Sequence, residues 1–192
     1  MPGNGAGPPE SEAPAPTGGT GTHHDRHVDK ASLGQIPPIG PIPGVEDLFV
    51  GALLYSTVAE VNSIARFIEA EDLDQPASTV LASIKALANR GVPPGPALVK
   101  DELHRRGQLT RTVATWLAAA ATSGACATAA QGYAAGVLAE AFRRQTESFG
   151  AALVSAAPSA AEGDLARLAE QASARIRYTY GRLTELRGEA DD

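Results

Sequence analysis

Apolar side chains recur every three to four positions over residues 76–109, which is the spacing that places them on one face of an α-helix. Val80, Ile84 and Leu87 form the first such face, and a second begins after a run of prolines that a helix interior does not tolerate. Gly91 and Gly107 follow the last apolar position of each face, where the left-handed cap of a helix favours glycine. The pattern predicts a helix, a rigid turn and a second helix that ends at Gly107.

Shorter apolar faces on either side of this stretch predict three further helices. One begins at Val45, another runs from Thr57 to about Ile68, and a third follows the central pair. The only tryptophan, Trp116, lies on the apolar face of this third helix, and we expect it to pack in the core or at an interface. These five helices, with room for a sixth, form a predicted head over residues 45–128.

Two much longer helical patterns follow, over about 129–156 and 161–186, and a short turn joins them. Long helices joined in this way form an αα-hairpin. Their apolar positions continue at spacings of three and four for longer than one contact within a chain requires, which predicts pairing with a second chain. The predicted self-association seam consists of Phe142, Phe149, Leu153, Leu165, Leu168, Ile176, Tyr180 and Leu183.

Composition agrees with an all-α fold. Hydrophobic residues make up 43% of the chain, with alanine prominent, and aromatic residues only 5%. Alanine, leucine, glutamate and arginine, which dominate the sequence after the first segment, favour helices. We therefore predict an all-α domain over residues 45–192, in which the hairpin spans about 129–187.

Residues 1–44 differ from the rest of the chain. Glycine and proline dominate them and no apolar periodicity is present, so we predict a disordered tail. His23, His24 and His27 lie in this tail at a spacing compatible with a transition metal. Because histidines in a flexible tail more often bind nothing specific, no metal site is predicted there.

The charge and the cysteine content exclude several classes of protein. The net charge is −6, without the excess of lysine and arginine that phosphate neutralisation requires, so DNA contact is predicted to be weak or indirect. Cys126, the only cysteine, fits a reducing interior and is expected to be a small buried residue. Neither a membrane-spanning stretch nor a secretory signal is evident, which predicts a cytoplasmic protein without membrane contact.

No motif in the chain indicates a reaction. The G-x-x-x-x-G-K-[ST] phosphate loop is missing, and one cysteine cannot supply a zinc site. His104 is expected on the solvent side of its helix. Four acidic residues, Glu69, Glu71, Asp72 and Asp74, share one predicted turn, where solvated charge is a better interpretation than a weak cation site. We predict no enzymatic activity for the chain alone, and no catalytic, cofactor-binding or metal-binding residues.

The stretch VEDLFVGALL resembles the first helix of the N-terminal domain of the bacterial DnaB-type hexameric replicative helicases, whose pattern is roughly E-Q-x-V-L-G-x-L-L. Later motifs of that family are matched in the same order and with compatible spacings over about residues 45–187. The matching residues are Glu46, Gly51, Leu53 and Leu54 in the first motif, Glu71, Asp72, Leu73 and Pro76 in the second, Gly91, Pro93, Val99, Leu103, Gly107 and Leu109 in the third, and Tyr133, Ala134, Val137, Arg143 and Arg144 in the last.

Several positions depart from the family pattern. Pro94 and Gly95 replace a Val-Asp pair, Leu98 replaces a threonine, and the small Ala82 stands at a bulky core position. Gly136 replaces an apolar residue in the first long helix. The sequence also ends at Asp192, where the family continues into an ATP-hydrolysing motor domain, so we expect no helicase activity from this polypeptide.

The resemblance implies a function in DNA replication. In the family, hairpins pair between subunits, six heads form a collar, and the collar contacts primase and loading factors. The implied function is a non-catalytic docking module that forms homo-oligomers. Its expected partners are a replicative helicase, a primase or a separately encoded ATPase motor subunit, and no cofactor is implied.

Two alternatives remain open on the sequence. The chain could be a nucleic-acid-binding regulator that uses arginine-lined helix faces, although a solvated helix face is the simpler interpretation of such residues. It could also be a subunit that supports an ATP-dependent DNA helicase in trans. The arginines in question are Arg105, Arg106, Arg111, Arg143 and Arg144 in one group, and Arg175, Arg177, Arg182 and Arg187 in the other.

Overall fold

A computed structural model of the chain describes residues 42–188. Every regular element within these residues is a helix and none is a strand, which confirms the predicted all-α class. The helices are α1 (Val45–Leu53), α2 (Val58–Ala65), α3 (Ala77–Asn89), α4 (Pro96–Arg105), α5 (Arg111–Ala121), α6 (Ala130–Ala156) and α7 (Glu162–Arg187), with short 3₁₀ turns η2 (Ala70–Asp72) and η3 (Ala127–Ala129). The predicted tail and its three histidines lie outside the described residues, apart from residues 42–44.

The helix ends follow from local sequence. Thr57 caps α2 by accepting a hydrogen bond from the Glu60 amide, while the Glu60 carboxylate accepts one from the Thr57 amide at 2.7 Å. Gly91 and Gly107 have φ angles of 75° and 67°, which confirms that both end their helices in the left-handed conformation. One boundary was predicted wrongly, because α2 ends at Ala65 rather than near residue 68.

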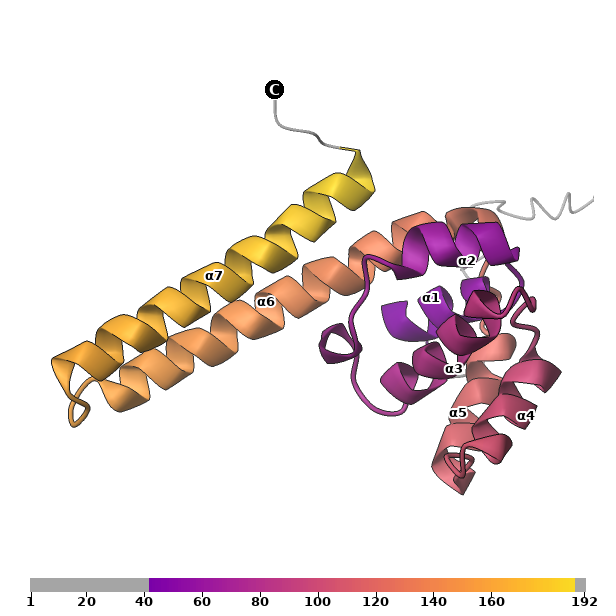
Figure 1. Cartoon of the computed structure of the whole chain (residues 1–192), viewed down its shortest axis with the longest axis horizontal. Helices are drawn as coiled ribbons and strands as arrows, with labels where there is room; N and C mark the ends of the chain where they lie inside the picture. The colour runs from indigo at the N-terminus through magenta and orange to yellow at the C-terminus, as the bar shows by residue number, and fades with distance from the viewer. Residues whose placement is uncertain (1–41, 189–192) are drawn as a thin grey trace, which may run out of the picture. The chain divides into compact units, whose positions relative to one another are not determined.

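The head is formed by α1 to α5 around a shared core (Figure 1). Helix α1 lies at its centre and contacts α3, α5 and α6, while α4 packs between α3 and α5. The largest fully buried side chains come from α1 to α4, from the segment after α2 and from α6; they include Phe49, Leu53, Ile68, Leu81, Ile84, Leu103 and Leu138. The first half of α6 is therefore part of the head as well as the start of the hairpin.

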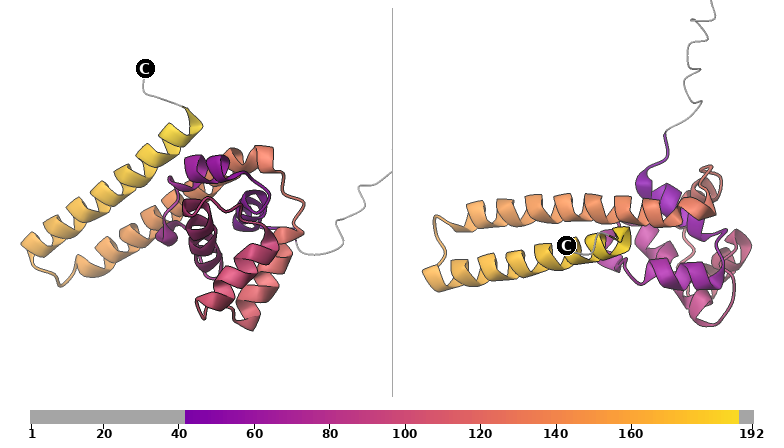
Figure 2. Two further views of the ribbon diagram at one scale, coloured as in Figure 1. Left: turned by 45° about the vertical axis from the view of Figure 1, so that its right-hand side comes forward. Right: turned by 90° about the horizontal axis from the view of Figure 1, so that it is seen from above.

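Helices α6 and α7 form the predicted antiparallel hairpin, which projects away from the head (Figures 1 and 2). At 1.5 Å per residue, each helix is about 40 Å long. The C-terminal end of α7 returns to the head, where Leu183 and Leu186 join its core. Within residues 42–188, no helix combines the length and the apolar character that crossing a bilayer requires.

Candidate functional site

The base of the hairpin is attached to the head by a buried ion pair. Arg182 of α7 is 7% exposed and Asp72 of η2 is 0% exposed. The guanidinium donates Nη1–H to Asp72 Oδ2 at 2.6 Å and Nη2–H to Oδ1 at 2.9 Å, which is the bidentate geometry of a strong arginine–carboxylate pair. The pair connects η2 to a helix 110 positions further along the chain.

Backbone and side-chain groups complete this junction. Arg182 Nη1 also donates to the Phe67 carbonyl at 2.9 Å, and the Asp72 carboxylate accepts from the Glu69 amide at 2.7 Å. The Thr179 hydroxyl accepts from Arg182 Nη2 and donates to Gln145 of α6 at 2.8 Å. Burial lowers the pKa of Arg182, but the hydrogen bond and charge of Asp72 outweigh it and raise the pKa above its ordinary value. The guanidinium therefore stays charged.

Two more arginines hold the same segment, residues 66–76, which we call the connector. Arg144 of α6 donates to the Asp72 carbonyl at 2.8 Å, and Arg175 of α7 pairs with Glu69 at 3.0 Å. The Tyr178 hydroxyl donates to Glu69 at 2.8 Å, and its ring lies under the Arg182 guanidinium. Burial raises the pKa of Glu69, but the Tyr178 hydrogen bond and the two arginines lower it below its usual value overall.

These contacts correct two predictions. The acidic turn was expected to be solvated, and this is wrong for Asp72, which is buried because Arg182 neutralises it, although Glu71 and Asp74 are exposed. Arg182 was assigned to an arginine-lined face, but it points into the protein. Since Arg144 and Arg175 also bind the connector, much of the proposed basic surface on the hairpin is used within the chain.

The arginines of the head are paired in the same way. Glu102 of α4 is 3% exposed and accepts hydrogen bonds from Arg90, Arg105 and Arg106, each with a closest distance of 2.7 Å. The bonds from Arg90 and Arg105 hold the pKa of Glu102 well below its usual range. Arg111, Arg143 and Arg177 are exposed, but the other arginines described above are paired with acidic groups of the same chain. The two arginine groups therefore do not form continuous basic faces.

The outer half of the hairpin has no core of its own. Between Phe142 and Gln171, which covers the end of α6, the turn and the start of α7, no residue is buried. Within one chain, the predicted seam residues are half-buried, apart from Tyr180 and Leu183. Tyr180 is 54% exposed and contacts the Phe142 ring at 5.9 Å between centroids, whereas Leu183 is 4% exposed in the core of the chain. Val154, which the sequence analysis did not single out, is 76% exposed.

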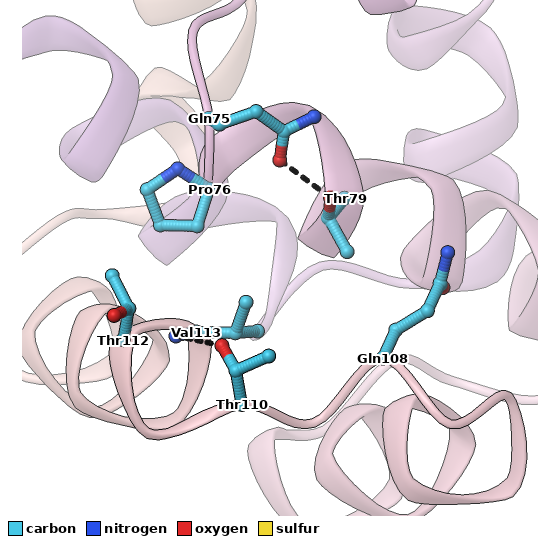
Figure 3. A pocket seen from close by; sticks show the side chains of 7 residues that line it. All are labelled: Gln75, Pro76, Thr79, Gln108, Thr110, Thr112 and Val113. Atoms are coloured by element: carbon cyan, nitrogen blue, oxygen red, sulfur yellow. Dashed lines mark hydrogen bonds between the residues drawn. The ribbon is translucent and has the colours of Figure 1, made fainter.

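A hollow of about 390 Å³ lies between the start of α3 and the start of α5 (Figure 3). Only uncharged side chains line it: Gln75, Pro76, Thr79, Gln108, Thr110, Thr112 and Val113. The Thr79 hydroxyl donates to Gln75, and the Thr110 hydroxyl accepts from the Val113 amide at the start of α5. The Thr79 and Thr110 hydroxyls are therefore engaged at helix starts, and no acidic or basic side chain lines the hollow.

The burial of three further residues can be compared with what was expected from the sequence. The expectation for Cys126 is wrong, because it precedes η3 in a loop and is exposed, with its sulfur 3.1 Å from the Thr128 hydroxyl. Trp116 is half-buried against the head core, and His104 faces solvent as expected. Residues 42–188 contain no group of three histidine, cysteine or acidic side chains arranged for a metal ion.

This arrangement of head and hairpin is shared with a known domain. The chain is similar to the crystal structure of the N-terminal domain of DnaB helicase from Mycobacterium tuberculosis, with 26% sequence identity and a TM-score of 0.58. The match covers 72% of this chain and 99% of that domain. No protein-family model matches the chain, and no curated protein matches its sequence.

The described part of the chain is thus a DnaB N-terminal-like domain. The match is to an N-terminal domain of a helicase and extends over nearly all of it. It confirms the resemblance seen in the sequence, and it identifies the chain as a helicase N-terminal-like module.

Proposed function

We propose that this chain is a self-associating docking module of the replication machinery. It pairs with further copies of itself through the hairpin, and its partners are a replicative helicase, a primase or a separately encoded motor subunit. The similarity to a helicase N-terminal domain supports the setting in DNA replication. The uncovered apolar positions of the outer hairpin support the self-association.

The physical argument rests on the outer hairpin. Long helices are stabilised mainly by burying an apolar face, since helix propensity alone is marginal in water. Here Phe149, Leu153, Leu165 and Leu168 lie where one helix covers them only partly, and no residue from 142 to 171 is buried. A second hairpin against this surface buries these side chains and supplies the missing core, as in a four-helix bundle.

Replacing Ile176 and Tyr180 with glutamate should convert the oligomer to a monomer. Both residues lie on α7 where it leaves the head, and two buried like charges per chain oppose pairing. Sedimentation velocity at several concentrations measures the change. Leu183, also predicted for the seam, is unsuitable because its replacement would disrupt the core of the single chain.

A matched control adds the same charge to the hairpin at exposed positions that are not part of the predicted seam. Ala151→Glu with Ala174→Glu places two glutamates at exposed positions of α6 and α7, and it should leave the oligomer intact. Circular dichroism establishes that both variants remain helical. An unchanged oligomer in the Ile176→Glu, Tyr180→Glu variant would remove the seam. Failure of the wild-type chain to bind purified helicase, primase or motor subunit would remove the docking function.

A further inference from the structure

Three arginines of the head, which we call the arginine cluster, meet at one buried carboxylate. Arg90 follows the end of α3, whereas Arg105 and Arg106 lie at the end of α4, where a helix dipole favours cations. Their guanidiniums make five hydrogen bonds to the two carboxylate oxygens of Glu102. Because a carboxylate accepts roughly four hydrogen bonds, Glu102 holds the cluster in place and has no accepting capacity left.

The arginine cluster keeps a surplus of positive charge. One carboxylate neutralises only one of the three guanidiniums, and all three arginines are exposed. Nη1 of Arg105 and both terminal nitrogens of Arg106 make no hydrogen bond within residues 42–188. Residues 90–111 contain five basic and two acidic side chains, in a chain whose net charge is −6. The cluster is therefore a compact positive region with N–H donors to spare on an acidic protein.

An exposed leucine lies beside the arginine cluster. Leu98 of α4 is 46% exposed. Residues four and seven positions apart lie on one face of a helix, so Leu98 shares its face with Glu102 and Arg105. This face of α4 therefore presents an apolar contact next to guanidinium donors. Helix α4 lies on the side of the head away from the hairpin tip (Figures 1 and 2), so pairing of the hairpin leaves this face accessible.

We propose that this face of α4 is a docking site for a short acidic segment of a partner protein. Carboxylates of the partner pair with the arginine cluster, since a guanidinium favours bidentate contacts, and an apolar side chain of the partner packs against Leu98. The inference rests on the proposed docking function and supplies the chemistry of the partner, but it does not depend on self-association. A long phosphate backbone matches less well, because the rest of the acidic chain repels it, whereas a short acidic segment contacts the cluster alone.

Fluorescence polarisation with a short labelled peptide tests this site. The peptide carries aspartates on both sides of a central leucine, and the wild-type chain should bind it with a dissociation constant that rises with salt. Arg105→Gln with Arg106→Gln should raise the dissociation constant roughly five- to tenfold, because two exposed charge pairs are lost. Arg143→Gln with Arg177→Gln removes the same charge from exposed positions of the hairpin, and it should leave the dissociation constant unchanged.

A second variant tests the site without removing a partner of Glu102. Leu98→Glu removes the apolar contact and adds a repelling charge at an exposed position, so it should raise the dissociation constant at least about fivefold without loss of helicity. Lys100→Gln changes the net charge by the same amount, but helical spacing places it on the opposite side of α4. This control should change the dissociation constant by less than about twofold.

Three results would overturn the docking site: no binding of the peptide at protein concentrations up to about 1 mM, equal binding of a peptide with asparagine in place of aspartate, or an unchanged dissociation constant in the Leu98→Glu variant. Tighter binding of single-stranded oligothymidylate at the same salt, lost in the same variants, would assign the cluster to nucleic acid instead. The Ile176→Glu, Tyr180→Glu variant should still bind the peptide, because the cluster lies on the head. A chain that binds a purified helicase, primase or motor subunit but not the peptide would remove this site alone and leave the proposed function standing.

Discussion

Replacing Arg182 with alanine should destabilise the protein by about 3–5 kcal/mol, because it leaves a buried carboxylate without its counter-ion. Asp72 is 0% exposed and would retain the Glu69 amide as a donor. The substitution also removes the donor to the Phe67 carbonyl and the partner of Thr179, so the connector and both hairpin helices lose a shared contact. Urea unfolding monitored by circular dichroism measures the loss.

An exposed ion pair in the same hairpin provides the control. Arg167 pairs with Asp164 at 2.7 Å, but both side chains are mostly in solvent, so Arg167→Ala should change the stability by less than about 1 kcal/mol. Arg182→Met combined with Asp72→Leu should cost less than Arg182→Ala, since no isolated charge is then buried. Equal losses for Arg182→Ala and Arg167→Ala would show that the junction does not hold the hairpin to the head.

Introducing a methyl group at Gly51 should destabilise the head by about 1–3 kcal/mol, since a well-packed core does not accept additional volume. An ideal Cβ at this position lies 2.5 Å from the Ala120 carbonyl oxygen and 2.6 Å from the Ser123 hydroxyl. The first of these atoms belongs to the backbone of α5, so relief requires α1 and α5 to move apart. Gly51→Val should cost more than Gly51→Ala in urea unfolding.

Gly181 is the matched control for this substitution. It lies inside α7, is exposed, and has no atom within 4 Å of an added Cβ. Because alanine favours a helix interior over glycine, Gly181→Ala should raise the stability by about 0.5–1 kcal/mol. The two glycine substitutions are thus expected to have opposite signs. A Gly51→Ala variant as stable as the wild type would contradict the close α1–α5 contact.

Features that depend on local sequence were predicted well. Gly91 and Gly107 end their helices as expected, because helix capping involves residues that are neighbours in the chain. The resemblance at Gly51 has a physical basis in the α1–α5 contact, where a side chain does not fit. The departure at Gly136 is explained too, since a Cβ there would lie 2.7 Å from a methyl group of Val45.

The junction of head and hairpin was not predicted because its partners are distant in the sequence. Nothing near Asp72 indicates that Arg182 will reach it, and an acidic turn usually remains in solvent. A weak signal was present, since Arg182 follows Thr179 on the same face of α7 as the core residue Leu186. Cys126 was misplaced for a different reason: a thiol between two helical runs and without a base partner was expected to be buried, but it lies at the start of η3, where it is exposed.

The solution mass of the unmodified chain tests the central claim most directly, because the outer hairpin lacks a core unless a second copy covers it. One chain has a mass of 19.7 kDa. Sedimentation equilibrium over a concentration series should give a mass of two or more chains that decreases on dilution. A mass of one chain at every concentration, with the hairpin still helical, would contradict self-association through this surface.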